Sequence, residues 1–238
     1  MRRTFIVVLF LLLVCFVGCK PKHPSVVTID PGFDPNKAGT ILVTPFISSI
    51  SEGEDPNRDS ERLTNKILWE MLSMRTDHTF LSPEQMRFAV NRSRLDDAYK
   101  KFELDWMTKH EADVDFLRKV KEALNVDLLL IPHVYLWFKD EADYREVGTA
   151  SSTQVGITIT LIDPVSGLIV WEATDENFKE SVRTEGDRAR VSVSGWDRRV
   201  DGVTVTGRDM YAAPPFEDVT TLVLEVLIGA LPQKGTFD

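Results

Sequence analysis

Two neighbouring apolar stretches constrain the fold more than any other feature of this 238-residue chain. Between 155 and 161, Val, Ile, Ile and Leu alternate with Gly, Thr and Thr, the period of two that is typical of a strand with one buried face. The segment DPVSG at 163–167 predicts a turn, and LIVWEA at 168–173 predicts the returning strand. The chain therefore contains an antiparallel hairpin that needs a packed core on at least one side.

Further strands and helices surround this hairpin. Apolar runs predict strands at 40–46, 79–81 and 126–138. Helical spacing of apolar residues predicts helices at 61–74, from Pro83 onward, within 91–110, at 113–125 and at 214–232. The firmest helix start is at 82–85, where Ser82 suits the N-cap, Pro83 the first helical position and Gln85 the capping box.

The chain opens with MRRTFIVVLFLLLVCFVGCK, which has the layout of an export signal. Arg2 and Arg3 precede an uncharged run of 13 residues, and a membrane-spanning helix needs roughly 20. A basic leader, a short apolar core and a small residue at the cut are typical of a secretory signal. The ending Val17-Gly18-Cys19 resembles the lipobox of bacterial lipoproteins, which implies that residues 1–18 are a lipoprotein signal peptide and that Cys19 is lipidated. The alternatives are an uncleaved anchor or a secreted protein that is cut elsewhere.

The rest of the chain divides into two parts. Residues 19–38 hold four prolines, which favours a lipidated tether whose fully extended length is at most about 65 Å. Residues 39–238 are long enough for a single globular α+β domain, with an exposed, glycine-containing excursion at about 179–210. In the lipoprotein pattern, Lys20 in place of aspartate after the cysteine implies the outer membrane, facing the periplasm.

Charge and cysteine content exclude several functions. Cys15 falls within the signal peptide, so the mature domain has no internal disulfide and no cysteine-based site. The chain has a net charge of −9, and without Arg2 and Arg3 it has 26 basic and 37 acidic residues, a charge of −11. A domain this acidic lacks the basic footprint that nucleic acid requires. Attachment to a membrane must then rest on the lipid at Cys19.

No catalytic, cofactor or metal site is predicted. The four histidines, His23, His78, His110 and His133, have no partner at metal-ligand spacing. Glycine-rich phosphate loops and a G-x-S-x-G elbow are also absent from the sequence. We therefore predict a protein that is not an enzyme, although a catalytic triad assembled by the fold would leave no such motif.

One aromatic stripe is a candidate partner surface. Tyr99, Phe102 and Trp106 recur at spacings of three and four, so they share one side of the predicted helix. Such a stripe either covers the core or remains exposed for a partner. Trp196, in the excursion, is a second candidate for contact with a partner.

Four segments resemble a known group of envelope proteins: VTPF at 43–46, NVDLLLIPHV at 125–134, VGITITLIDPVSGLIVWE at 155–172 and PPFEDVTTLVLEVLIGALP at 214–232. They are similar to outer-membrane lipoprotein activators of penicillin-binding proteins, curli-secretion lipoproteins and the TolB amino-terminal domain. The resemblance implies an α+β fold, in which helices flank a mixed sheet of four to five strands and a C-terminal helix packs on the sheet.

The same resemblance implies a function in binding or assembly. The first hypothesis is a lipid-anchored, non-catalytic module that binds, assembles or activates another cell-envelope protein. The alternatives are a subunit that forms a homo-oligomer in an outer-membrane secretion complex, and a cell-envelope hydrolase without a recognisable motif.

Overall fold

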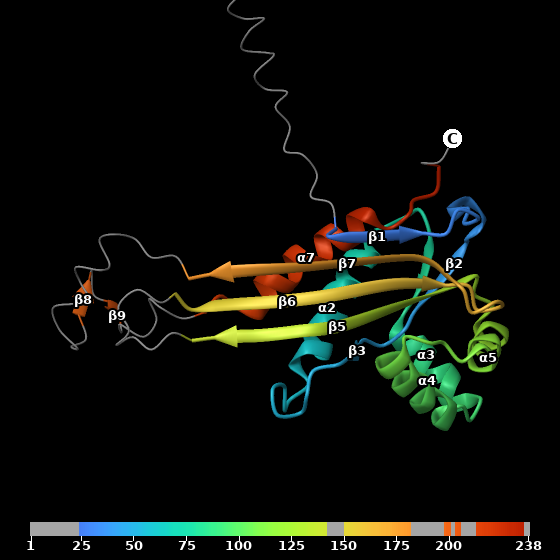
Figure 1. Ribbon diagram of the computed structural model, residues 1–238, viewed down its shortest axis with the longest axis horizontal. Coiled ribbons are helices and arrows are strands. Elements are labelled where there is room, and N and C mark those ends of the chain that lie inside the picture. The colour runs from blue at the N-terminus through green and yellow to red at the C-terminus, as the bar shows by residue number, and fades with distance from the viewer. Residues whose placement is uncertain (1–23, 142–149, 182–197, 201–202, 206–212, 236–238) are drawn as a thin grey trace, which may run out of the picture.

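The computed structural model describes residues 24–141, 150–181, 198–200, 203–205 and 213–235. The elements are β1 (Val26–Ile29), the 3₁₀ helix η1 (Pro35–Lys37), β2 (Thr40–Val43), β3 (Ile47–Ser48), α2 (Asp59–Ser73), β4 (Thr79–Leu81), α3 (Pro83–Arg92), α4 (Asp96–Lys109), α5 (Val114–Leu124), β5 (Leu128–Asp140), β6 (Ser152–Ile162), β7 (Ile169–Glu180), β8 (Arg198–Val200), β9 (Val203–Val205) and α7 (Phe216–Ala230). Figure 1 shows one large sheet with helices on both of its faces.

The central sheet is mixed and has seven strands. Its order is β1-β7-β6-β5-β2-β4, with β3 beside β5, and β8 and β9 form a separate pair. Strands β5, β6, β7 and β1 are joined in antiparallel pairs, whereas β2 runs parallel to both β4 and β5. The predicted fold class is confirmed. The sheet is wider than the four to five strands expected, because β1 and β3 add to it.

A proline divides the predicted strand at 40–46 into two strands. The amide of Thr44 still donates to the carbonyl of Leu130 at 2.9 Å, but Pro45 has no N–H to continue the ladder. Pairing with β5 then resumes in β3, with Ile47 opposite His133 and Ser48 opposite Val134.

Part of the predicted tether also belongs to the sheet. β1 pairs with β7 from Val26 opposite Thr174 to Ile29 opposite Trp171, and it forms one edge of the sheet. Ser25, just before it, donates a hydrogen bond from Oγ to Oδ1 of Asp175 at 3.0 Å. The chain is therefore held to the folded domain from residue 25 onward.

Helices α2 and α7 cover one face of the sheet. We call the apolar interior between this face and the two helices the first core. It includes Leu68 and Leu72 of α2, Val223 and Leu227 of α7, and Trp171 of β7. α7 begins after Pro214-Pro215 and ends at Ala230, just before the predicted end at Leu231-Pro232. The helix predicted at 61–74 ends at Ser73 in the structure. Met74 therefore lies beyond α2, and its side chain is 75% exposed.

The other face is covered only at one end, by α3, α4 and α5 (Figure 1). We call the interior at this end the second core; its buried sheet residues are Leu42, Ile47, Leu129, Ile131 and Ile162. Toward the opposite end of β5–β7 this face is uncovered, and Tyr135, Phe138 and Phe178 are exposed there. No helix in the described part of the chain is long and apolar enough to cross a bilayer.

Candidate docking cleft

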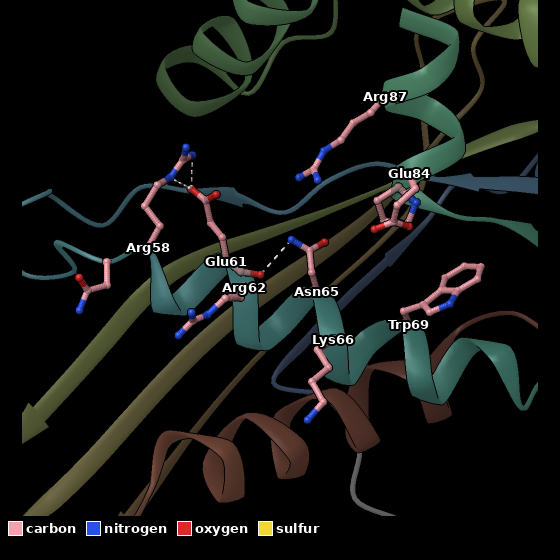
Figure 2. Close-up of a pocket in the computed structure, with 10 residues that line it drawn as sticks. Arg58, Glu61, Arg62, Asn65, Lys66, Trp69, Glu84 and Arg87 are labelled. Atoms are coloured by element: carbon pink, nitrogen blue, oxygen red, sulfur yellow. Dashed lines mark hydrogen bonds and ion pairs between the residues drawn. The ribbon is translucent and has the colours of Figure 1, made fainter. Parts of the chain in front are cut away.

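A cleft of about 420 Å³ lies between α2 and α3 (Figure 2). Basic residues outnumber acidic ones on its walls, although the whole chain is acidic. Its lining consists of Asn57, Arg58, Glu61, Arg62, Asn65, Lys66, Trp69, Pro83, Glu84 and Arg87. Four basic residues thus line the cleft together with two acidic ones, which makes it a locally positive surface. Arg62 and Lys66 extend from the side of α2 that lies away from Arg87 (Figure 2).

The α2 wall begins at a capped helix end. The Asp55 carboxylate accepts hydrogen bonds from the amides of Asp59 and Ser60, both at 2.8 Å. Burial alone would raise the pKa of Asp55, but hydrogen bonds from Ser60 and Asp59 outweigh it and hold the pKa below its ordinary value. Arg58 has a left-handed backbone, with φ of 53°, and its guanidinium pairs with Glu61 at 2.6 Å. These contacts fix the first turn of the wall.

Asn65 joins the same wall to the sheet. Its Oδ1 accepts from the amide of Phe46 at 3.2 Å, and its Nδ2 donates to the carbonyl of Glu61 at 2.9 Å. Because Phe46 lies in the link between β2 and β3, α2 is held in register with the sheet. The floor of the cleft is therefore preformed.

The α3 wall starts at the predicted capping box, which the structure confirms. The Ser82 amide donates to Oε1 of Gln85 at 2.7 Å, and the Gln85 amide donates to Oγ of Ser82 at 3.3 Å. From the next turn, Arg87 extends toward α2, opposite Glu61 and Asn65 (Figure 2).

Two cations of the cleft differ from the other two in their contacts, although Arg87 lies near enough to Glu103 of α4 to offset part of the rise in the pKa of that carboxyl. Neither Lys66 nor Arg87 forms a hydrogen bond or an ion pair among the described residues, whereas Arg58 pairs with Glu61 and Arg62 with Asp59. A free guanidinium binds a carboxylate or phosphate with two parallel hydrogen bonds, and Lys supplies a point charge. Trp69 adds an apolar surface at the end of the cleft (Figure 2). The arrangement suits an anionic side chain attached to an apolar one.

The structure corrects the predicted partner surface on α4. Phe102 and Trp106 are 0% and 1% exposed, and Tyr99 is partly buried beside them. The Phe102 ring stacks on Phe116 of α5 with centroids 5.2 Å apart. The stripe faces inward because α4 closes the second core, so it covers the core and is not available to a partner. Trp196 and Cys19 lie outside the described residues.

The histidines form contacts that are structural. His78 is buried between the carbonyls of Ala38 and Pro232, at 3.0 and 3.2 Å. His110 contacts Glu172 at 2.8 Å. His23 lies outside the described residues.

His133 resembles a catalytic base in one respect only. Its Nε2 lies 2.6 Å from Oγ of Ser49, the geometry of a base and a nucleophile. Burial, with a smaller contribution from His110, lowers the pKa of His133 to about 4, so the ring is neutral and weakly basic at pH 7. In the described chain no carboxylate forms a hydrogen bond with the other ring nitrogen. The pair thus lacks the third group of a triad.

Groups of three or more potential metal-ligating side chains do not occur within the described residues. The residues that sequence reasoning missed are those of the cleft. Arg58, Arg62 and Lys66 recur every four residues, and this basic stripe on α2 is visible in the sequence. The sequence around Arg87 does not predict its place in the cleft, because only the folded chain brings α3 beside α2.

Comparison with protein-family models and with curated proteins finds no match. Among solved structures, the chain is similar to lipoprotein GNA1162 from Neisseria meningitidis, with 13% identity, 65% of this chain and 92% of that chain covered, and a TM-score of 0.36. It is similar to the PelC dodecamer from Paraburkholderia phytofirmans, with 13% identity, coverages of 85% and 94%, and a TM-score of 0.36. A third similar structure is the LpoB C-terminal domain from Escherichia coli, with 15% identity, coverages of 62% and 88%, and a TM-score of 0.32.

One of these proteins is named as a lipoprotein. Their identities and TM-scores are low, so the function of this chain is argued from its own residues.

Proposed function

We propose that this chain is a lipoprotein of the cell envelope whose domain binds an acidic segment of another envelope protein in the cleft between α2 and α3. Residues 1–18 direct export, and a lipid on Cys19 holds the protein at the outer membrane, facing the periplasm. The protein performs no chemistry. It acts as a binding, assembly or activation module.

Two unpaired cations beside an indole are the observation that carries the docking proposal. Lys66 of α2 and Arg87 of α3 both line the cleft, Asn65 ties α2 to the sheet, and Trp69 lies at the end of the cleft. The remainder of the chain is strongly acidic, so an acidic partner is repelled elsewhere and attracted here. The leader and Cys19 support the envelope location, as the sequence indicates.

A photoreactive amino acid in place of Glu84, on the rim of the cleft, tests the docking in living cells. We expect it to form a crosslink to one envelope protein, through a peptide that mass spectrometry finds to be acidic. The double variant Lys66→Glu, Arg87→Glu should weaken this crosslink at least about tenfold, because it replaces attraction by repulsion.

The double variant Lys100→Glu, Lys119→Glu is the matched control. It makes the same change in net charge at two exposed lysines outside the cleft. Equal crosslinking by the two double variants, or a basic crosslinked peptide, contradicts the docking proposal.

The anchor has a separate test. Metabolic labelling with a palmitate analogue should tag the wild-type chain and leave the Cys19→Ala variant unlabelled and unprocessed. Label on the Cys19→Ala variant contradicts the assignment of Cys19.

A further inference from the structure

The sheet has an apolar edge at β1. All four side chains of β1 are exposed, and three of them are apolar: Val26 is 59%, Val27 42% and Ile29 46% exposed. Phe178 of the neighbouring β7 is 49% exposed. It lies on the same face of the sheet as Val26, because Val26 pairs with Thr174, four residues before Phe178. Val27 and Ile29 point to the opposite face, because they pair with Ala173 and Trp171 of the first core. We call Val26, Val27, Ile29 and Phe178, which lie on both faces of the sheet at β1, the apolar edge.

Edge strands of soluble proteins are usually protected by charged side chains or by a covering element. β1 carries no charge, and its outer side has no partner strand among the described residues. We therefore expect another protein surface or a membrane to cover this edge.

The linker between β1 and Cys19 is short, so the apolar edge must lie close to the membrane that holds Cys19. Ser25 is hydrogen-bonded to Asp175, which leaves only residues 20–24 between the folded domain and the lipid-bearing residue. The six steps from Cys19 to Ser25 extend at most about 20 Å. β1 is antiparallel to β7, so the linker leaves β1 toward the end of β7 that carries Phe178, about 10 Å from Asp175 along the strand.

This reach leaves no room for a folded protein between the apolar edge and the membrane, since a small domain is about 30 Å across. The charged neighbours of the edge do not suit an electrostatic contact with anionic lipid either. Glu176 and Glu180 flank Phe178, and Lys179 is paired with Asp218 at 2.7 Å. The chemistry that remains is apolar contact with the bilayer.

We propose that the apolar edge lies in the headgroup region of the bilayer that holds Cys19. This inference rests on the lipid proposed at that residue. The apolar edge then faces the membrane, while the docking cleft lies toward β4, at the opposite edge of the sheet. The lipid and the apolar side chains together orient the domain.

Spin labelling of the full lipidated chain tests this orientation. Cys15 leaves with the signal peptide and the Cys19 thiol carries the lipid, so a Phe178→Cys variant has one reactive thiol. Leu104→Cys, on α4, is the matched control at a side chain that is 57% exposed. Each labelled protein is placed in vesicles of phosphatidylethanolamine with a minor fraction of phosphatidylglycerol. Collisions are measured with oxygen, which concentrates in lipid, and with a water-soluble nickel chelate.

We expect the label at 178 to collide more with oxygen and at least about threefold less with the nickel chelate than the label at 104, because the apolar side sinks into the interface. The difference should persist at 1 M NaCl, since it does not depend on surface charge. Circular dichroism of both variants establishes that they are folded.

The other outcomes are distinguishable. Fewer collisions with both reagents at 178 mean that a second copy of the chain covers the edge, and this overturns the bilayer contact. Equal access at 178 and 104 in chains that float with the vesicles overturns it too, while the proposed anchor stands. Chains that fail to float overturn both the anchor and the inference.

Discussion

The two ends of strands β5, β6 and β7 differ in what covers them. At one end, helices lie on both faces of the sheet, with the first core on one side and the second core on the other. At the other end, helices cover one face only, and Tyr135, Phe138 and Phe178 are exposed on the other. The same three strands thus serve as the centre of a sandwich at one end and as an open surface at the other, so a side chain on the uncovered face contributes less to stability at the open end.

The largest expected effect is at the sandwiched end. Trp106→Ala removes a fully buried ring from the second core and should lower the free energy of unfolding by about 3–5 kcal/mol. Urea unfolding followed by circular dichroism measures the change. If Trp106 served a partner instead, its replacement would leave stability near that of the wild type and reduce only binding.

His133, at the border between the two ends, should make stability depend on pH. Its folded pKa of about 4 lies below the ordinary value of 6.5, because burial disfavours the charged ring. Its stabilising contribution is therefore complete above pH 6.5 and is lost as the pH falls toward 4, by about 2–3 kcal/mol.

Urea midpoints at pH 7 and pH 4.5 test this dependence. His133→Gln should lose clearly less stability than the wild type over that range. His110 and Glu172 act electrostatically on the same ring, so a His110→Gln background separates their contribution. Equal losses in the wild type and in His133→Gln would contradict the assignment.

A smaller effect is expected in the turn between β6 and β7, which α5 covers. Gly167 has φ of +74°, and a Cβ added there would lie 2.6 Å from Cγ2 of Val114. Gly167→Ala should therefore destabilise the domain by about 1–2 kcal/mol.

Gly229→Ala in α7 is the matched control for the turn variant. A Cβ at 229 meets no atom within 4 Å, so the change should stabilise the helix by up to about 1 kcal/mol. Thermal unfolding of both variants gives the comparison, and destabilisation of similar size in the two would refute the role assigned to the turn.

The smallest effect is expected at the open end. Phe138 is 51% exposed, so Phe138→Ser should change the free energy of unfolding by no more than about 0.5 kcal/mol. A loss of 2 kcal/mol or more in the same urea titration would mean that something covers this end of the sheet.

Local patterns made much of this fold predictable. The alternation at 155–161 and the Ser82 capping box each depend on residues close in sequence, and the structure has a strand and a helix at these positions. β1 was missed because four residues in a proline-bearing segment have no strand signal of their own, and β7, more than 140 residues away, stabilises it.

The candidate site was less predictable than the fold. Spacing alone showed that Tyr99, Phe102 and Trp106 share one side of a helix, but it did not distinguish a buried side from an exposed one. The spacing of Arg58, Arg62 and Lys66 is visible in the sequence. That these residues line a cleft is not, because the cleft also needs Arg87 from another helix. A cleft between two helices that are separate in sequence cannot be predicted from the residues of either helix alone.

The pairing of β1 with β7 also has a mechanical consequence. Only four residue pairs hold β1 to the sheet, and it lies at an edge, so a pull on the chain from Cys19 loads these pairs one after another. Once β1 has peeled away, the next residue that holds the chain is Phe33, which packs on the first core, so the distance the chain can span from Cys19 rises from about 20 Å to about 48 Å. With the lipid proposed on Cys19, the paired β1 keeps the domain close to the membrane, and release of β1 under load lengthens the connection.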